Sequence, residues 1–245
     1  MKKENSLRLY CFSPLVMLIT FLIEAGAALY VIFKYRMTRA AQLITALLGA
    51  LATFQLAEYM VCEGAFFFSS LDWARLGYAA ITILPPLAIH LGLTIAKRKN
   101  MPLIATAYGS AVVFMTFFLF VGQGMQAQQC LGNYVIFEIA PYAALPYGIY
   151  YQGWLIVGVV LAWRAHYQLK DPNQQKALVW LVMGYLSFMV PSFIVYLLSP
   201  QTVAGLPSIM CGFAVLMALT LLFKVSPLVL KEGNPAQKSV RASTK

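Results

Sequence analysis

The chain has 245 residues, of which 61% are hydrophobic and only 11% are charged, and its mean hydropathy is +0.74. An ordinary soluble domain is about 45–50% apolar and about 25% charged. This composition excludes a water-soluble domain, because a fold of this length has too little interior to bury so much apolar surface. It indicates that lipid is the solvent for most of the chain.

Seven apolar runs are long enough to cross a bilayer. A spanning helix needs roughly 20 mostly apolar residues, since each residue rises ~1.5 Å through a hydrocarbon core ~30 Å thick. Continuous rather than alternating runs favour helices over a barrel. We therefore expect one all-α domain over 1–245, a polytopic seven-transmembrane helix bundle with a short basic tail at 227–245. The expected spans are about 12–33, 40–62, 76–96, 102–122, 147–165, 177–198 and 206–226.

The net charge of +10 is concentrated in a few loops. Of the 18 Lys and Arg residues, fourteen follow the first, third, fifth and seventh expected spans, which places them on one side of the membrane. The positive-inside rule makes that side cytoplasmic and puts the N-terminus outside, against a weaker opposite signal from Lys2, Lys3 and Arg8. We expect a multi-pass protein of the cell membrane whose basic face contacts membrane lipids and does not bind nucleic acid.

Polar side chains interrupt three of the expected spans. Glu24 lies near the middle of the first and His90 in the inner half of the third. Gln55 and Glu58 share one face of the second, because a three-residue spacing returns to the same side of a helix. Ionisable groups at membrane depth are costly and indicate functional positions that face the bundle interior. Glu24 and His90 lie at similar depth, which predicts a buried pair between them. The alternative is that each side chain bonds a backbone carbonyl freed by a proline.

Prolines and cysteines add further expectations. Pro85-Pro86 and Pro191 fall inside expected spans, where the missing N–H groups predict kinks that either shape the helices or open a cavity between them. Cys62 and Cys130 both lie toward the outer face, where they either form a disulfide or remain as thiols. The cysteine spacing does not match a metal site, so we expect no metal.

The longest expected outer loop, about 123–146, leads into an aromatic stretch that ends at Trp154. Tyr and Trp gather at membrane interfaces, which accounts for most of these side chains. The alternative is a short interfacial helix that covers a pocket from outside.

The stretch FQLAEYMVCEGAFFFSSLDWARLGYAAITILPPLAIHLGLTIAKRK resembles part of the seven-helix N-terminal membrane region of certain bacterial histidine kinases. The resemblance implies a module that senses an external or membrane-borne ligand and passes the signal to a cytoplasmic output. The segment SPLVLKEGNPAQKSVRASTK, after the last expected span, has no phospho-acceptor helix or ATP-binding domain. We therefore expect no kinase activity and a separate cytoplasmic signalling partner. The matching residues are Glu58, Trp73, Arg75, Tyr78, Pro85 and Pro86.

The resulting expectation is a sensor or receptor-like module that binds an unknown small ligand, is not an enzyme and needs no cofactor. The sequence contains no serine–histidine pair, HxxxH motif or phosphate-binding glycine loop. For Glu58, a purely structural ion pair with Arg75 is the alternative to ligand binding. A small transporter or channel, or an accessory subunit of a membrane complex, are the alternative functions. The expected ligand-binding residues are Glu58, Gln55, Glu24, His90, Arg75, Trp73, Tyr78 and Trp154.

Overall fold

The computed structural model describes residues 14–64, 68–121, 124–130, 135–198 and 206–232, with the backbone alone for 125–130 and 135–138. In these ranges, seven helical spans are long and apolar enough to cross a membrane, which confirms the number and the approximate positions of the expected spans. Their bounds are Leu15–Lys34, Arg39–Glu63, Ser70–Ile95, Met101–Phe120, Pro141–His166, Pro172–Leu198 and Leu206–Val229.

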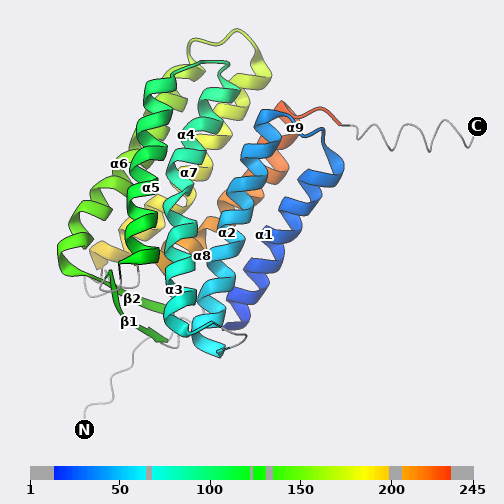
Figure 1. Ribbon diagram of the computed structural model, residues 1–245. Helices are drawn as coiled ribbons and strands as arrows, with labels where there is room; N and C mark the ends of the chain where they lie inside the picture. The colour runs from blue at the N-terminus through cyan, green and yellow to red at the C-terminus, as the bar shows by residue number, and fades with distance from the viewer. Residues whose placement is uncertain (1–13, 65–67, 122–123, 131–134, 199–205, 233–245) are drawn as a thin grey trace, which may run out of the picture.

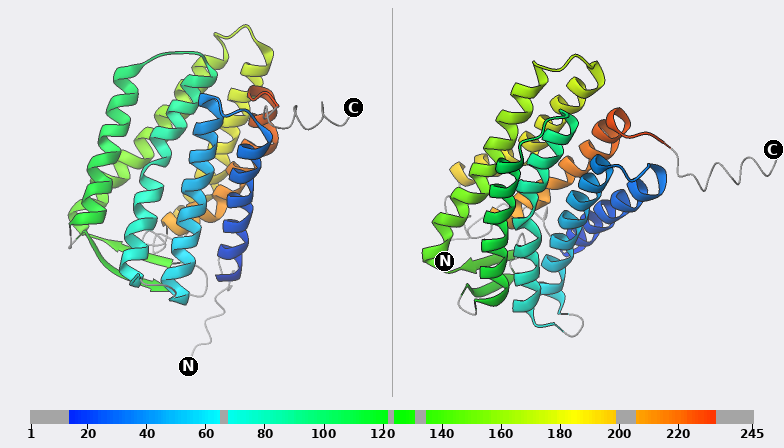
Figure 2. Two further views of the ribbon diagram at one scale, coloured as in Figure 1. Left: turned by 45° about the vertical axis from the view of Figure 1, so that its right-hand side comes forward. Right: turned by 45° about the horizontal axis from the view of Figure 1, so that its top comes forward.

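The central helix of the bundle is α2, which packs against α1, α3, α4 and α8, whereas α1 and α5 lie at opposite edges (Figures 1 and 2). The third span consists of α3 and α4, and the seventh of α8, a π-helical turn η3 and α9. The elements in chain order are α1 (Pro14–Lys34), α2 (Arg39–Glu63), α3 (Ser70–Thr82), α4 (Leu84–Ile95), α5 (Met101–Phe120), β1 (Met125–Cys130), β2 (Val135–Ile139), α6 (Pro141–His166), α7 (Pro172–Leu198), α8 (Leu206–Thr220), η3 (Leu221–Val225) and α9 (Ser226–Val229).

Polar residues fix the starts of several helices. The Thr38 side chain accepts a hydrogen bond from the Ala41 N–H at the start of α2. Ser69 and Asp72 form a reciprocal capping box at the start of α3. Such caps satisfy N–H groups that have no partner inside the helix. They therefore set where each span begins, and with it the depth of the side chains along the span.

The Pro85-Pro86 pair divides the third span at Ile83, which confirms the predicted distortion. Because Pro86 has no N–H, the carbonyl of Thr82, four residues earlier, loses its helical partner. The Tyr150 hydroxyl of α6 donates to this carbonyl at 2.6 Å. The freed carbonyl is thus bonded by a tyrosine of a neighbouring helix, and the expectation that a buried acid or His90 bonds it is wrong here. Pro191, in contrast, lies inside the continuous helix α7.

Residues 125–139 contain a two-stranded antiparallel hairpin, so the interfacial helix considered for this loop is wrong. Its pairing runs from Met125 opposite Ile139 to Cys130 opposite Val135. The second strand, VIFEI, is rich in β-branched and aromatic residues, which favour strands. The hairpin lies across one end of the bundle, where it contacts α2, α3 and α8 (Figure 1).

Basic side chains gather at the opposite end of the bundle, where α1, α4, α6 and α9 end and α2, α5 and α7 begin (Figure 1). After α9 the chain returns to the α1–α2 connection: the Arg36 N–H donates to the Lys231 carbonyl at 3.3 Å, and Lys34 pairs with Glu232 at 3.2 Å. We call this region the basic end. Its described cations are Lys34, Arg36, Arg39, Lys97, Arg98, Lys99, Arg164, Lys170, Lys176, Lys224 and Lys231.

Gly77 sets the close approach of α3 to α2. A Cβ atom at position 77 would lie 3.1 Å from the Ala57 Cβ and 3.4 Å from the Phe54 ring. Gly109, on the exposed side of α5, provides a contrast, because no described atom lies within 4 Å of a Cβ at that position.

We expect Gly77→Leu to lower the free energy of unfolding by about 1–3 kcal/mol, because overpacking forces the two helices apart. Gly109→Leu should change it by less than about 0.5 kcal/mol. Unfolding of both variants in mixed micelles with increasing SDS measures the difference. Equal effects of the two substitutions would contradict the close packing of α3 on α2.

Candidate functional site

A cluster of polar side chains lies inside the bundle, where α1, α2 and α8 meet. Gln55 and Glu58 share one face of α2, as expected, and are only 2% and 1% exposed. Glu24 of α1 is 0% exposed and lies within electrostatic range of Glu58. With Ser208 and Cys211 of α8, these residues form what we call the buried polar cluster.

The α8 side of the cluster holds α2 through two polar contacts. The Ser208 side chain donates a hydrogen bond to the Glu58 carboxyl group. The Gln55 Nε2 donates to the backbone carbonyl of Cys211 at 2.9 Å. A hydrogen bond of this kind contributes about 1 kcal/mol net to stability. Gln55 and Glu58 therefore fix the position of α8 against α2 in the middle of the apolar core.

Three carboxyl oxygens of the cluster have no hydrogen-bond partner among the described residues: both oxygens of Glu24 and Oε1 of Glu58. Burying an isolated carboxylate costs far more than a typical hydrogen bond returns, and even a neutral polar group left without a partner is destabilising. The cluster therefore has unused hydrogen-bonding capacity, which suits a cation or a hydrogen-bond donor on a bound molecule.

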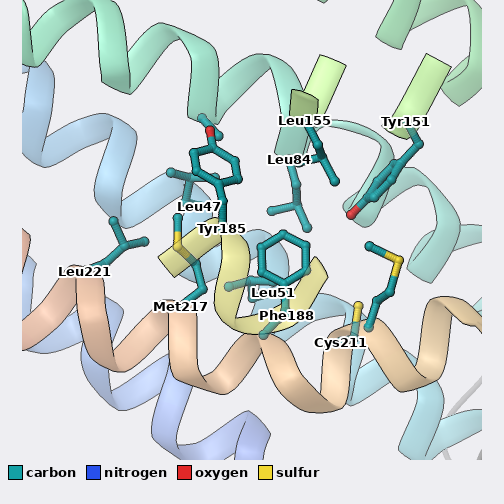
Figure 3. Close-up of a pocket in the computed structure, with 13 residues that line it drawn as sticks. Leu47, Leu51, Leu84, Tyr151, Leu155, Tyr185, Phe188, Cys211, Met217 and Leu221 are labelled. Atoms are coloured by element: carbon teal, nitrogen blue, oxygen red, sulfur yellow. The ribbon is translucent and has the colours of Figure 1, made fainter. Parts of the chain in front are cut away.

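A small cavity of about 30 Å³ adjoins the cluster at Cys211 (Figure 3). Figure 3 shows the Tyr151 hydroxyl and the Cys211 thiol directed toward this space, in an otherwise apolar surround. Such a volume holds about one or two water molecules, so a larger molecule enters only when helices separate. The lining residues are Leu47, Leu51, Leu84, Ala88, Tyr151, Leu155, Tyr185, Phe188, Met210, Cys211, Ala214, Met217 and Leu221.

Gln55 and Glu58 do not line this cavity. They lie behind Cys211, whose carbonyl is bonded by Gln55 and whose thiol faces the space. The expected outer cavity lined by Gln55 and Glu58 remains a prediction, since both side chains are enclosed by helices in this conformation.

The predicted pair of Glu24 with His90 is wrong. The His90 Nδ1 lies 3.2 Å from the Tyr108 hydroxyl of α5, and His90 borders a groove that also contains Arg39 of the basic end. Glu24 instead lies within electrostatic range of Glu58. The two residues are at comparable positions along their spans, but His90 takes the face of α4 that meets α5, and sequence depth says nothing about which face is used.

The structural ion pair considered for Glu58 and Arg75 is also wrong. Glu58 accepts its hydrogen bond from Ser208, whereas Arg75 pairs with Asp72, one turn earlier on α3, at 3.7 Å. An i,i+3 pair needs no second helix and holds Arg75 at the hairpin end of the bundle. Trp73, its neighbour on α3, packs edge-on against Phe68 with ring centroids 5.5 Å apart.

The remaining two expected site residues have aromatic or hydroxyl neighbours. Tyr78 is 2% exposed and packs against Phe118 and Tyr147, with ring centroids 4.9 and 5.7 Å apart. It also lies within electrostatic range of Glu58, so it borders the cluster. Trp154 donates from Nε1 to the Ser110 hydroxyl at 3.0 Å, on the α5 side of α6. The structure therefore brings Tyr78, and not Trp154, toward the buried polar cluster.

Cys62 is disulfide-bonded, and Cys211 is a buried free thiol. The predicted partner of Cys62 is Cys130, whose side chain lies outside the described residues. Its backbone, at the end of β1, belongs to the hairpin that contacts α2. The Cys62–Cys130 pairing therefore remains a prediction.

The contribution of α8 and α6 to the site was not predicted from the sequence. Ser208, Cys211 and Tyr151 all lie in apolar runs, where a small hydroxyl, a thiol or a tyrosine is unremarkable. The available signal was helical spacing: Ser208 and Cys211 are three residues apart and so share a face of α8.

Within the described ranges, no group of three or more His, Cys, Asp or Glu side chains is placed to hold a metal ion.

No protein-family model matches the chain, and no curated protein matches it either. The resemblance to the membrane region of histidine kinases therefore remains a prediction from the residues quoted above.

Replacing a buried polar side chain that has no described partner and replacing one that is hydrogen-bonded should change the free energy of unfolding in opposite directions. We expect Glu24→Met to raise the free energy of unfolding by about 1–2 kcal/mol, because it removes a buried carboxyl group without a partner. Gln55→Leu should lower it by about 1 kcal/mol, because it removes the bond to the Cys211 carbonyl. SDS unfolding in mixed micelles measures both. A Glu24→Met variant that is clearly destabilised would show that this carboxyl group has a structural partner.

Proposed function

We propose that the protein is a sensor or receptor-like module of the cell membrane, with the hairpin outside and the basic end in the cytoplasm. Seven spans of suitable length and the one-sided distribution of Lys and Arg support this orientation. The observation that carries the function is the buried polar cluster, in which three carboxyl oxygens have no hydrogen-bond partner among the described residues, beside a small cavity. A purely structural bundle gains no stability from such groups, whereas a binding site uses them.

The ligand of this site is a small, mostly apolar molecule that carries a cation or a hydrogen-bond donor. The cavity wall is built mainly from Leu, Ala, Phe and Met side chains, which favour an apolar body. Glu24 and Glu58 supply acceptors for the polar group of the ligand. Pro191 lies three residues beyond Phe188 of the cavity wall, where its missing N–H weakens α7 and allows the helix to move.

The route from the cavity to the basic end runs through α8 and η3. Met217 of α8 and Leu221, the first residue of η3, both line the cavity. In η3 the Ser226 N–H bonds to the Leu221 carbonyl, five residues earlier, and π-helical turns inside α-helices are frequent at functional sites. From there α9 leads to Lys231, whose carbonyl is bonded by the Arg36 N–H. A shift of α8 would thus reach the α1–α2 connection, where a separate cytoplasmic partner can detect it.

A small cation or proton transporter is the second candidate, because two neighbouring buried carboxyl groups also suit a transported cation. The described cavity argues against it. Toward the basic end its wall includes Leu47, Leu221 and Tyr185, and one tyrosine hydroxyl among apolar side chains does not make a continuous polar path. An accessory-subunit role would leave the unpartnered carboxyl oxygens without a use.

We expect small-molecule retention to depend on Glu58. Native mass spectrometry of the protein released from mild detergent should show a bound small molecule on the wild type and a loss of about tenfold or more in Glu58→Gln, because one charged hydrogen bond is worth roughly 1.5–3 kcal/mol. Glu63→Gln is the matched control, since Glu63 is an exposed acid at the end of the same helix. A wild type that carries only lipids, or an equal loss in both variants, would refute the binding site.

A ²²Na⁺ and pH-gradient flux assay in liposomes separates the two candidates. A sensor binds without net transport, whereas a transporter moves Na⁺ or protons in a manner that Glu58→Gln abolishes. Glu58-dependent flux would replace the sensor proposal with the transporter.

A further inference from the structure

A second pocket lies between α4 and α6 at the basic end, apart from the cavity beside the buried polar cluster. Its volume is about 250 Å³. Its polar lining residues, Arg98, Arg164 and Gln168, lie near or just beyond the ends of α4 and α6, whereas the apolar Leu93 and Leu161 lie about one turn deeper along the same helices. Small residues of the same two helices, among them Gly92, Gly158 and Ala162, complete the wall. The pocket is therefore amphipathic, with its cationic part at the ends of two spans.

The two guanidinium groups share this pocket, and neither has an acidic partner in the part of the chain that the structure describes. The ion pairs among the described residues are Lys34–Glu232 and Asp72–Arg75, and neither involves Arg98 or Arg164. The nearest acid along the chain, Asp171, accepts a hydrogen bond from the Asn173 N–H at 2.9 Å as α7 begins. Two like charges in one pocket repel each other, and an anion between them removes that repulsion.

The backbone after α4 is strained in a way that directs Arg98 to this pocket. Lys97 has φ +54°, a left-handed conformation that favours glycine and costs a lysine about 1 kcal/mol. The Arg98 N–H bonds back to the Leu93 carbonyl at 2.9 Å, which closes the helix end as a Schellman motif. The chain then turns toward α6, and Arg98 donates to the Gln168 side chain. Both the turn and this hydrogen bond hold the guanidinium group over the pocket.

We propose that this pocket binds the phosphate of an anionic phospholipid headgroup, with an acyl chain along the apolar side of the pocket. Guanidinium groups bind phosphate oxygens in a bidentate manner. The position at the ends of two spans is the depth at which lipid headgroups lie. The apolar half of the pocket matches a lipid chain better than a soluble phosphate ester, which has no use for Leu93 and Leu161. No residue of the buried polar cluster lines this pocket.

Native mass spectrometry from micelles doped with a defined lipid tests the site. The wild type should retain phosphatidylglycerol and retain phosphatidylcholine about tenfold less. Arg98→Gln/Arg164→Gln should lower phosphatidylglycerol retention by about tenfold or more, as expected for the loss of charged hydrogen bonds. Arg98→Lys/Arg164→Lys, which keeps the charge and loses the bidentate geometry, should fall between. The control Arg39→Gln/Lys170→Gln removes two charges of the basic end outside the pocket and should behave as the wild type.

Three results would overturn the proposal. Equal retention of the two lipids would show that the phosphate charge is not recognised. An equal loss in the Arg39→Gln/Lys170→Gln control would show only general attraction to the basic end. Displacement of phosphatidylglycerol by millimolar glycerol 3-phosphate would assign the pocket to a soluble phosphate ester. SDS unfolding of each variant verifies that the fold is retained, which is expected because Arg98 and Arg164 are exposed.

Discussion

The constraint on which this structure depends is that polar groups inside an apolar bundle must find their partners within the protein. The Thr82 carbonyl, freed by Pro86, takes the Tyr150 hydroxyl and so ties α6 to the break between α3 and α4. The Gln55 side chain takes the Cys211 carbonyl and ties α8 to α2. In an interior where apolar contacts alone allow sliding, these hydrogen bonds select one arrangement of the helices.

The buried polar cluster meets that constraint only in part, because some of its carboxyl oxygens have no described partner. Glu58 accepts a hydrogen bond from Ser208 at one oxygen, whereas its other oxygen and both oxygens of Glu24 have no hydrogen-bond partner among the described residues. The same helices could have satisfied both groups, because hydroxyl side chains such as Thr20 bond local carbonyls elsewhere in α1. Among the described residues, Thr45 Oγ1 and Ser226 Oγ are also buried without a hydrogen bond, but two carboxyl groups in one cluster are the costliest case and are the reason for proposing a bound partner. The adjoining cavity reaches Cys211 and would have to widen to admit a molecule larger than water.

The sequence predicted the helical spans more accurately than the contacts between them. Apolar run length and the positions of Lys and Arg are local properties, so the seven spans and the clustering of charge at one end followed directly. Which helices touch is not local: the Glu24–His90 and Glu58–Arg75 pairs were inferred from depth and proximity, and the structure pairs these residues with Glu58, Tyr108, Ser208 and Asp72 instead. The hairpin was missed because its strands lie in a loop whose polar and aromatic residues resemble an interfacial segment. The roles of Ser208 and Cys211 could not be predicted from the sequence, because they depend on which side of α8 faces α2.

The break at Ile83 is what allows α4 to serve two sites. After the break at the prolines, α4 packs against α6, whereas α3 packs against α5. One face of α4 supplies Leu84 and Ala88 to the small cavity, and the next supplies Ile89, Gly92 and Leu93 to the pocket at the basic end. A helix that forms one wall of each space cannot tilt to enlarge the cavity without moving the wall of the pocket. The Pro85-Pro86 pair therefore does more than bend a span: it makes α4 the element through which a ligand in the core and a lipid at the basic end would affect each other.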